Sequence, residues 1–100
     1  MICTLTARRL KPGKFDEFRS KWGPDEQEAD VASKWNPVYL CRDVGDENVV
    51  VAFGMFQGSL DELRQSQEEY GYAETVDALS DLVDEVLLDG AYEVIEEIRP

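Results

Sequence analysis

The sequence predicts a single α+β domain in which helices cover one face of a four-stranded antiparallel sheet. Apolar and β-branched residues recur with the spacing of a strand at the start, in the middle and near the end of the chain. Segments with the apolar spacing of an amphipathic helix separate the first strand from the middle ones, and the middle ones from the last. The length of 100 residues is ordinary for one domain, so we assign residues 1–100 to one domain without a linker.

The first strand and the first helix occupy the N-terminal part of the chain. Residues 2–10 alternate around β-branched side chains, as a strand does. In the helix that follows, Phe15, Phe18 and Trp22 share one stripe, with spacings of three and four. A Gly-Pro pair directly after Trp22 interrupts or ends this helix, because proline lacks the amide donor and clashes with the preceding turn. Residues 25–34 have a weaker helical pattern.

A hairpin forms the middle of the predicted sheet. Residues 38–43 are expected to form a short strand, residues 45–48 a polar turn and residues 49–56 the next strand. The segment 49–56 contains no charged residue and is apolar on both of its faces. A strand of this kind is expected to be covered on both faces in the folded protein.

Two further helices follow the hairpin. The sequence from Ser59 to Glu62 is a capping box, which starts a helix over residues 60–69. Gly71 breaks this helix, and residues 73–86 are expected to form another. The residues of this second helix that we expect to face the core are Val76, Leu79, Val86 and either Leu82 or Val83.

The order of the elements predicts the topology. A turn at Asp89-Gly90 leads into the last strand, for which we expect residues 91–98. Strand, helix, hairpin, helix and strand, joined by right-handed crossovers, give the ferredoxin-like βαββαβ topology. The helices of that fold lie on one face of the sheet, so the second apolar face of residues 49–56 stays open. We therefore expect a homodimer in which a second subunit packs on the open sheet face.

Composition and charge exclude several classes of function. The chain has 22 acidic and ten basic side chains, a net charge of −12, and this charge excludes a general nucleic-acid binder. It has no histidine, which removes imidazole acid–base catalysis, histidine triads and histidine-held metal or haem. No apolar run approaches the roughly 20 residues of a membrane helix, and residues 1–10 lack the apolar stretch typical of a signal peptide. We expect a cytoplasmic protein that has no membrane partner and no metal site. Cys3 and Cys41 are expected to be reduced thiols.

Three groups of residues resemble one protein family. They are residues 11–14 (Lys-Pro-Gly-Lys) before the aromatic helix, the hairpin of residues 39–55, and residues 84–94 after the capping-box helices. Together they resemble the antibiotic biosynthesis monooxygenase family over nearly the whole chain. The resemblance implies a dimeric α+β barrel with a pocket between sheet and helices in each subunit.

The resemblance also implies an activity. Some members of the family are cofactor-free oxygenases of aromatic polyketides or quinols, and others degrade haem with the help of a histidine. Because this chain has no histidine, we exclude the haem-degrading branch and expect no cofactor. The catalytic residues of the family have no counterpart here by motif, so the candidates below come from the chemistry of the side chains.

Cofactor-free oxygenation needs groups that bind an electron-rich molecule, deprotonate it and stabilise the anion. Tyr92, as a proton donor or acceptor, and Arg42, as an anion partner, are the candidate catalytic residues. The candidate substrate-binding residues are Trp22, Trp35, Arg8, Tyr70, Tyr72 and Phe53. Structural roles are the alternative: Trp22 in the core, Tyr92 half-buried on its strand and Arg42 in an ion pair.

Two functions from different classes remain open. The first is a dimeric, cofactor-independent monooxygenase that acts on a small aromatic or quinol-type molecule. The second is a non-catalytic dimeric barrel that binds a small ligand or serves as an accessory subunit. The enzyme needs a cavity with an ionisable group, whereas a structural barrel fills that space with Phe15, Phe18, Phe53 and leucines.

Overall fold

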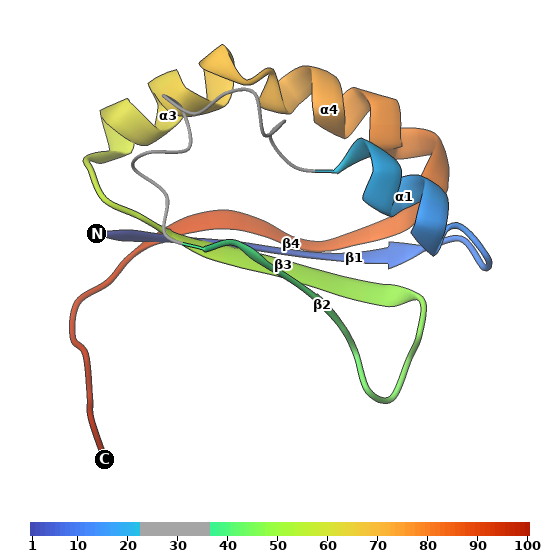
Figure 1. Ribbon diagram of the computed structural model, residues 1–100, viewed down its shortest axis with the longest axis horizontal. Helices are drawn as coiled ribbons and strands as arrows, with labels where there is room; N and C mark the ends of the chain where they lie inside the picture. The colour runs from blue at the N-terminus through green and yellow to red at the C-terminus, as the bar shows by residue number, and fades with distance from the viewer. Residues whose placement is uncertain (23–36) are drawn as a thin grey trace.

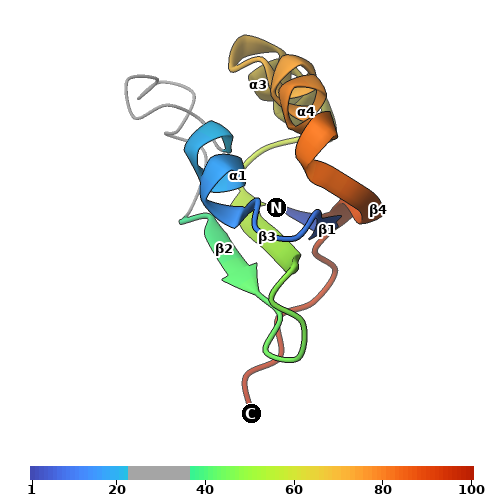
Figure 2. The same cartoon turned by 90° about the vertical axis from the view of Figure 1, so that its right-hand side faces the viewer.

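The computed structural model describes residues 1–22 and 37–100. Within these ranges, helices lie on one face of a four-stranded antiparallel sheet with the strand order β2-β3-β1-β4 (Figure 1). The view from the side shows that no described helix lies on the other face of the sheet (Figure 2). This is the predicted ferredoxin-like arrangement. The expected helix over residues 25–34 and the candidate Trp35 lie outside the described residues.

The two central strands have the predicted bounds. β1 spans Ile2–Leu10 and pairs along its length with β3, Val49–Phe56. β2, Tyr39–Arg42, is shorter than the predicted strand and pairs with β3 across the expected hairpin turn. β4, Val83–Glu93, lies on the other side of β1 and forms the second edge of the sheet.

The first two helices confirm the patterns that predict them. α1 spans Phe15–Lys21 and places Phe18 in the core. α3 spans Leu60–Glu69 and begins with the capping box. The Glu62 amide donates to Ser59 Oγ at 3.2 Å, and the Ser59 amide donates to Glu62 Oε1 at 3.1 Å.

The prediction for the last helix and the last strand is wrong in its boundaries. α4 spans Tyr72–Leu79 rather than 73–86, and a 3₁₀ turn, Ser80–Leu82, follows it. β4 begins at Val83 and ends at Glu93, instead of spanning 91–98. The apolar spacing that resembles a helix stripe in this segment is overridden by pairing, because β4 hydrogen-bonds along the whole of β1.

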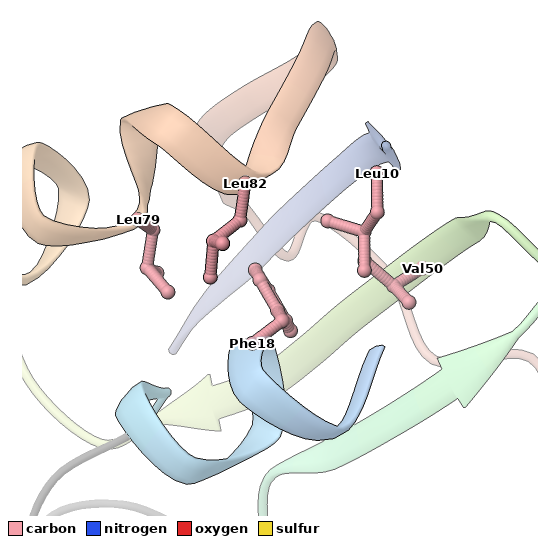
Figure 3. Packing of buried hydrophobic residues seen from close by; sticks show 5 residues of the cluster. All are labelled: Leu10, Phe18, Val50, Leu79 and Leu82. Atoms are coloured by element: carbon pink, nitrogen blue, oxygen red, sulfur yellow. The ribbon is translucent and has the colours of Figure 1, made fainter. Parts of the chain in front are cut away.

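Two apolar clusters fix the helices on the sheet. The larger one joins β1, β3, α1 and the end of α4 (Figure 3) and consists of Leu10, Phe18, Val50, Leu79 and Leu82. The smaller one lies near the start of α3 and consists of Ile2, Phe56 and Leu63. β1 contributes to both clusters through its two ends, and the residues between those ends are polar on the helix-covered face.

The opposite face of the sheet is apolar and partly exposed. Cross-strand pairs on this face join Leu5 to Phe53 and Ala7 to Val51. The Tyr39 ring stacks on the ring of Phe53 at 5.2 Å between centroids. The predicted second apolar face therefore exists, whereas the homodimer that would cover it stays a prediction.

Candidate functional site

A cavity of about 120 Å³ lies between the sheet and the junction of α3 with α4. Along the helix-covered face of β1, Thr4 and Thr6 stand between the apolar ends of the strand. The facing part of β3 is Ala52, a residue with little side chain. Small and polar residues therefore leave a space between the two apolar clusters. The cavity is lined by Thr4, Thr6, Trp22, Val38, Ala52, Phe53, Arg64, Gln67, Tyr70, Tyr72, Thr75, Asp89, Gly90 and Ala91.

A charged network borders the cavity on the side of β1 and β4. Arg8 is 3 % exposed, and its Nη2 donates to Asp89 Oδ2 at 3.2 Å. The Tyr72 hydroxyl lies 3.0 Å from each oxygen of the same carboxylate. The Arg8 guanidinium also lies over the Trp22 ring, 5.4 Å from its centroid. One carboxylate thus joins a buried cation to a tyrosine hydroxyl at the cavity wall.

The register between β1 and β4 places Asp89 in this network. Asp89 pairs with Thr6, and Arg8 lies two residues further along β1, on the same face of the sheet. Diagonal neighbours of this kind are within reach of long side chains. Asp89 and Arg8 therefore meet diagonally on the helix-covered face.

Two tyrosines at the junction of α3 and α4 remain hydroxyl donors. Burial raises the pKa of Tyr70, and the charges of Tyr72 and Asp89 raise it further. Burial also raises the pKa of Tyr72, although Arg8 opposes this shift. The two rings meet edge to face at 6.1 Å. Both hydroxyls are consequently protonated at neutral pH and can donate hydrogen bonds to a ligand or a carboxylate.

The backbone conformation of Gly71 determines how Tyr70 and Tyr72 are oriented toward the cavity. Gly71 has φ = 74°, in the left-handed region, and lies between the end of α3 and the start of α4. The Thr75 hydroxyl donates to the Gly71 carbonyl at 3.0 Å, which fixes the first turn of α4. Tyr70 and Tyr72 flank this sharp change of direction, and both line the cavity.

The structure brings together five of the eight candidate residues. Four of them, Trp22, Tyr70, Tyr72 and Phe53, line the cavity, and Arg8 lies beside it in contact with Trp22 and Asp89. Phe53 borders the cavity, but its ring lies on the open face of the sheet, where it stacks on Tyr39. Trp22 also packs against the larger apolar cluster, so its structural role and its place in the wall coexist.

The two candidate catalytic residues lie elsewhere. Tyr92 pairs with Cys3 on the open face of the sheet. Its hydroxyl group lies over Gly90, and a β-carbon added to that glycine would lie 2.6 Å from the hydroxyl oxygen. The Arg42 guanidinium lies over the Phe15 ring, 4.2 Å from its centroid, in a separate depression. Neither residue lines the cavity, and their proposed catalytic roles stay predictions.

Asp89, Arg64, Gln67 and Thr75 line the cavity but are absent from the candidates chosen from sequence. Asp89 was missed because Asp-Gly is a turn signal, whereas here it lies within a strand. The spacing of three between Arg64 and Gln67 on α3, and between Gln67 and the C-cap residue Tyr70, would have indicated that they are neighbours along that helix.

Neither a metal centre nor a membrane helix is found in the part of the chain that the structure describes. Residues 1–22 and 37–100 contain no group of three potential metal ligands. No described helix is long and apolar enough to cross a membrane. Cys3 and Cys41 are free thiols on strands separated by β3.

The sheet order and the helices on one face place the chain in the class of ferredoxin-like α+β proteins. Within this class it shares its fold with proteins named for the antibiotic biosynthesis monooxygenases. The protein from Deinococcus radiodurans aligns with a TM-score of 0.77 at 15 % identity, over 100 % of this chain and 98 % of that one. The protein from Nitrosomonas europaea aligns with a TM-score of 0.71 at 13 % identity, over 96 % of this chain and 100 % of that one.

A further similar structure is that of a variant of SnoaB, a cofactor-independent oxygenase from Streptomyces nogalater. It aligns with a TM-score of 0.68 at 17 % identity, over 99 % of this chain and 97 % of that one. No family model and no curated protein matches the sequence. The resemblance seen in the sequence is thus confirmed at the level of the fold.

Proposed function

We propose that the protein is a cofactor-independent monooxygenase that oxidises a small, electron-rich phenol in the cavity between the sheet and α3–α4. The observation that carries this proposal is the network of Arg8, Asp89 and Tyr72 at the wall of an aromatic cavity. Phe18 and the leucines pack beside the cavity without filling it, which favours the enzyme over a purely structural barrel. The fold shared with SnoaB supports the same class of reaction.

The volume of the cavity favours a substrate with one aromatic ring. An engineered protein cavity of roughly 150 Å³ binds benzene, and this cavity measures about 120 Å³. The rings of Trp22, Tyr70 and Tyr72 supply surfaces against which a planar molecule can pack. A single-ring phenol fits this space better than a fused polycyclic compound.

The network has the groups that the first chemical step requires. Asp89 is the general base: its carboxylate takes the phenolic proton, with Tyr72 as the neighbouring donor. Arg8 balances the negative charge, which is divided between Asp89 and the phenolate as the proton moves. Burial of Arg8 strengthens this interaction, because the local dielectric constant is lower than that of water.

The substrate and O₂ supply all the electrons of the reaction. The phenolate ring carbon opposite its oxygen forms a C–O bond with O₂, and protonation gives a hydroperoxide on that carbon. Loss of the hydrogen on this carbon and cleavage of the O–O bond release water and leave a quinone carbonyl. Overall, a phenol and O₂ give a quinone and water, with four electrons passing from the ring to oxygen.

Oxygen consumption tests the proposal. The purified protein is assayed with resorcinol and with 1,3,5-trihydroxybenzene in an oxygen electrode, and heat-denatured protein is the control for spontaneous oxidation. We expect quinone formation that Asp89→Asn lowers about a hundredfold, because a general base contributes at least that much. Tyr72→Phe, which keeps the ring, is expected to lower turnover less.

A comparison of two tyrosine variants decides where the reaction takes place. A larger decrease in turnover for Tyr72→Phe than for Tyr92→Phe supports the cavity, whereas a decrease for Tyr92→Phe alone would place the chemistry on the open face of the sheet. Binding without oxygen consumption by any of these phenols would support the non-catalytic barrel instead. Circular dichroism of each variant shows whether it is folded.

We also infer a homodimer through the open sheet face. Leu5, Val51 and Met55 are half-buried on this face in the single chain. Exposed Leu88 and Tyr92 extend the apolar surface across β4. A second copy is the partner that best fits this surface, because the resemblance implies barrels of two facing sheets. Burial of this face would remove its apolar residues from water.

A further inference from the structure

One wall of the cavity carries an exposed arginine whose guanidinium group forms no ion pair with a described acidic side chain. Arg64 lies on α3 and lines the cavity. Its Nη1 donates to Gln67 Oε1 at 3.0 Å, a neutral partner. By contrast, Arg8 pairs with Asp89 and Arg9 pairs with Glu85. Within residues 1–22 and 37–100, no carboxylate lies within 4.0 Å of Arg64.

Among the described arginines, Arg8, Arg9 and Arg99 form ion pairs with described carboxylates, whereas Arg19, Arg42 and Arg64 do not. Of the three described arginines without such a pair, Arg64 is the one that lines the cavity. Gln67 uses one of the guanidinium donors and leaves the others for a ligand. The planar fork of donors in arginine matches a carboxylate better than it matches a neutral group.

The Arg64 side chain is directed along α3 toward the two tyrosines. Arg64 and Gln67 lie on α3, and Tyr70 is the C-cap of this helix. The guanidinium group of Arg64 bonds to Gln67, which is one turn closer to Tyr70. A ring beside Tyr70 and Tyr72 can therefore extend a short side chain toward the Arg64 guanidinium.

The charges in the cavity distinguish its two ends. At the end formed by β1 and β4, the charge of Arg8 is balanced by Asp89, so this pair offers no net attraction to an anion. At the α3 end, Arg64 bonds to the neutral Gln67 and forms no ion pair with a described residue. A ligand with a phenol at one end and an anion at the other complements both.

We propose that the substrate is an anionic phenol, with an electron-rich ring and a carboxylate on a short side chain, and that Arg64 determines this specificity. The inference rests on the proposed function, because it names the substrate class of the same cavity. Arg64 binds the carboxylate and orients the ring, while the phenolic hydroxyl group lies at Asp89. Arg64 takes no part in proton transfer.

A matched pair of ligands tests the inference. We would measure the dissociation constants of 3,5-dihydroxyphenylacetate and its methyl ester by isothermal titration calorimetry. The acid is expected to bind about fivefold more tightly than the ester, the contribution of one solvent-accessible ion pair. Added salt should reduce this preference, because it screens the pair.

Two variants identify the group responsible. Arg64→Gln should abolish the preference for the acid and leave the affinity for the ester unchanged. Arg99→Gln removes the same charge from the C-terminal tail, where Arg99 pairs with Glu97, and should keep the preference. Equal binding of acid and ester by the unaltered protein, no binding of either, or an unchanged preference in Arg64→Gln would overturn the inference.

Oxygen consumption separates this inference from the proposed function. If the acid binds through Arg64 but no oxygen is consumed, the monooxygenase proposal fails and the anion site stands. If neutral phenols are oxidised as readily as the acid, the anion site fails and the monooxygenase proposal stands.

Discussion

Arg8 and Asp89 meet diagonally across β1 and β4, with 3.2 Å between Nη2 and Oδ2. The Arg8 side chain is 3 % exposed and the Asp89 side chain 38 % exposed. Arg8 is therefore buried inside the domain, whereas Asp89 is partly exposed at the cavity wall. A second pair on the same two strands, Arg9–Glu85, is shorter at 2.6 Å but exposed on both sides. The two pairs have different environments and therefore different consequences for stability.

Asp89→Asn is expected to destabilise the protein by about 3 kcal/mol, because it leaves the buried Arg8 without its counter-charge. Glu85→Gln removes the partner of exposed Arg9 and is expected to change the free energy of unfolding by less than about 1 kcal/mol. Urea unfolding of both variants gives the comparison. Equal losses would show that the burial of Arg8 does not determine the strength of its pair.

Stability is expected to fall at alkaline pH because of Tyr70 and Tyr72. Their native pKa values are raised above the ordinary value of 10.0, so above about pH 10 the unfolded state loses protons that the native state keeps. The stabilisation is complete below that pH and declines as the pH rises toward the native pKa values. Urea unfolding between pH 8 and pH 11 measures the slope.

Tyr70→Phe is the matched variant for the alkaline effect. It keeps the ring and removes the titrating hydroxyl group, so its stability should decline less steeply above pH 10 than that of the unaltered protein. An identical slope in the two proteins would assign the alkaline loss to other groups.

Gly71→Ala is expected to destabilise the protein by about 1 kcal/mol and to weaken ligand binding. Its φ of 74° is strained for alanine, although the added β-carbon would meet nothing closer than Glu74 Oε2 at 3.4 Å. Relief of this strain would move Tyr70 and Tyr72, which flank the glycine. Calorimetric titration with 3,5-dihydroxyphenylacetate measures the effect on binding.

Gly13→Ala is the control for Gly71→Ala. Gly13 has a similar φ of 78°, no atom near the position of a β-carbon and no place in the wall of the cavity. It should lose similar stability and keep its affinity. Equal losses of affinity in the two variants would contradict a positioning role for Gly71.

Leu5→Lys is expected to convert the inferred dimer into a monomer. Leu5 pairs with Phe53 on the open sheet face, where a lysine would place a charge within the contact. Val44→Lys adds the same charge at a fully exposed position in the β2–β3 turn and should leave the dimer intact. Sedimentation equilibrium distinguishes the 11.4 kDa chain from twice that mass.

A mass of one chain for the unaltered protein at micromolar concentration would refute the dimer. Circular dichroism of Leu5→Lys separates loss of the contact from loss of the fold. A folded Leu5→Lys variant that keeps twice the chain mass would place the contact on another surface.

The sequence by itself determined the elements whose signals are local. The alternation of residues 2–10, the uncharged run 49–56 and the capping box at Ser59 predicted β1, β3 and the start of α3 at their observed positions. The aromatic spacing of Phe15 and Phe18 also predicted α1. These patterns depend on neighbours within a few residues, so no tertiary information was needed.

Tertiary structure decided the position of β4 and the composition of the site. Val83 and Val86 fit both a helix stripe and a strand, and pairing with the whole of β1 selected the strand. The same register placed Tyr92 on the open face and Asp89 beside Arg8, residues 81 positions apart in the chain. Side chains from distant segments meet only after the sheet has formed, so local patterns could predict Arg8 and Tyr72 as candidates but not the carboxylate that joins them.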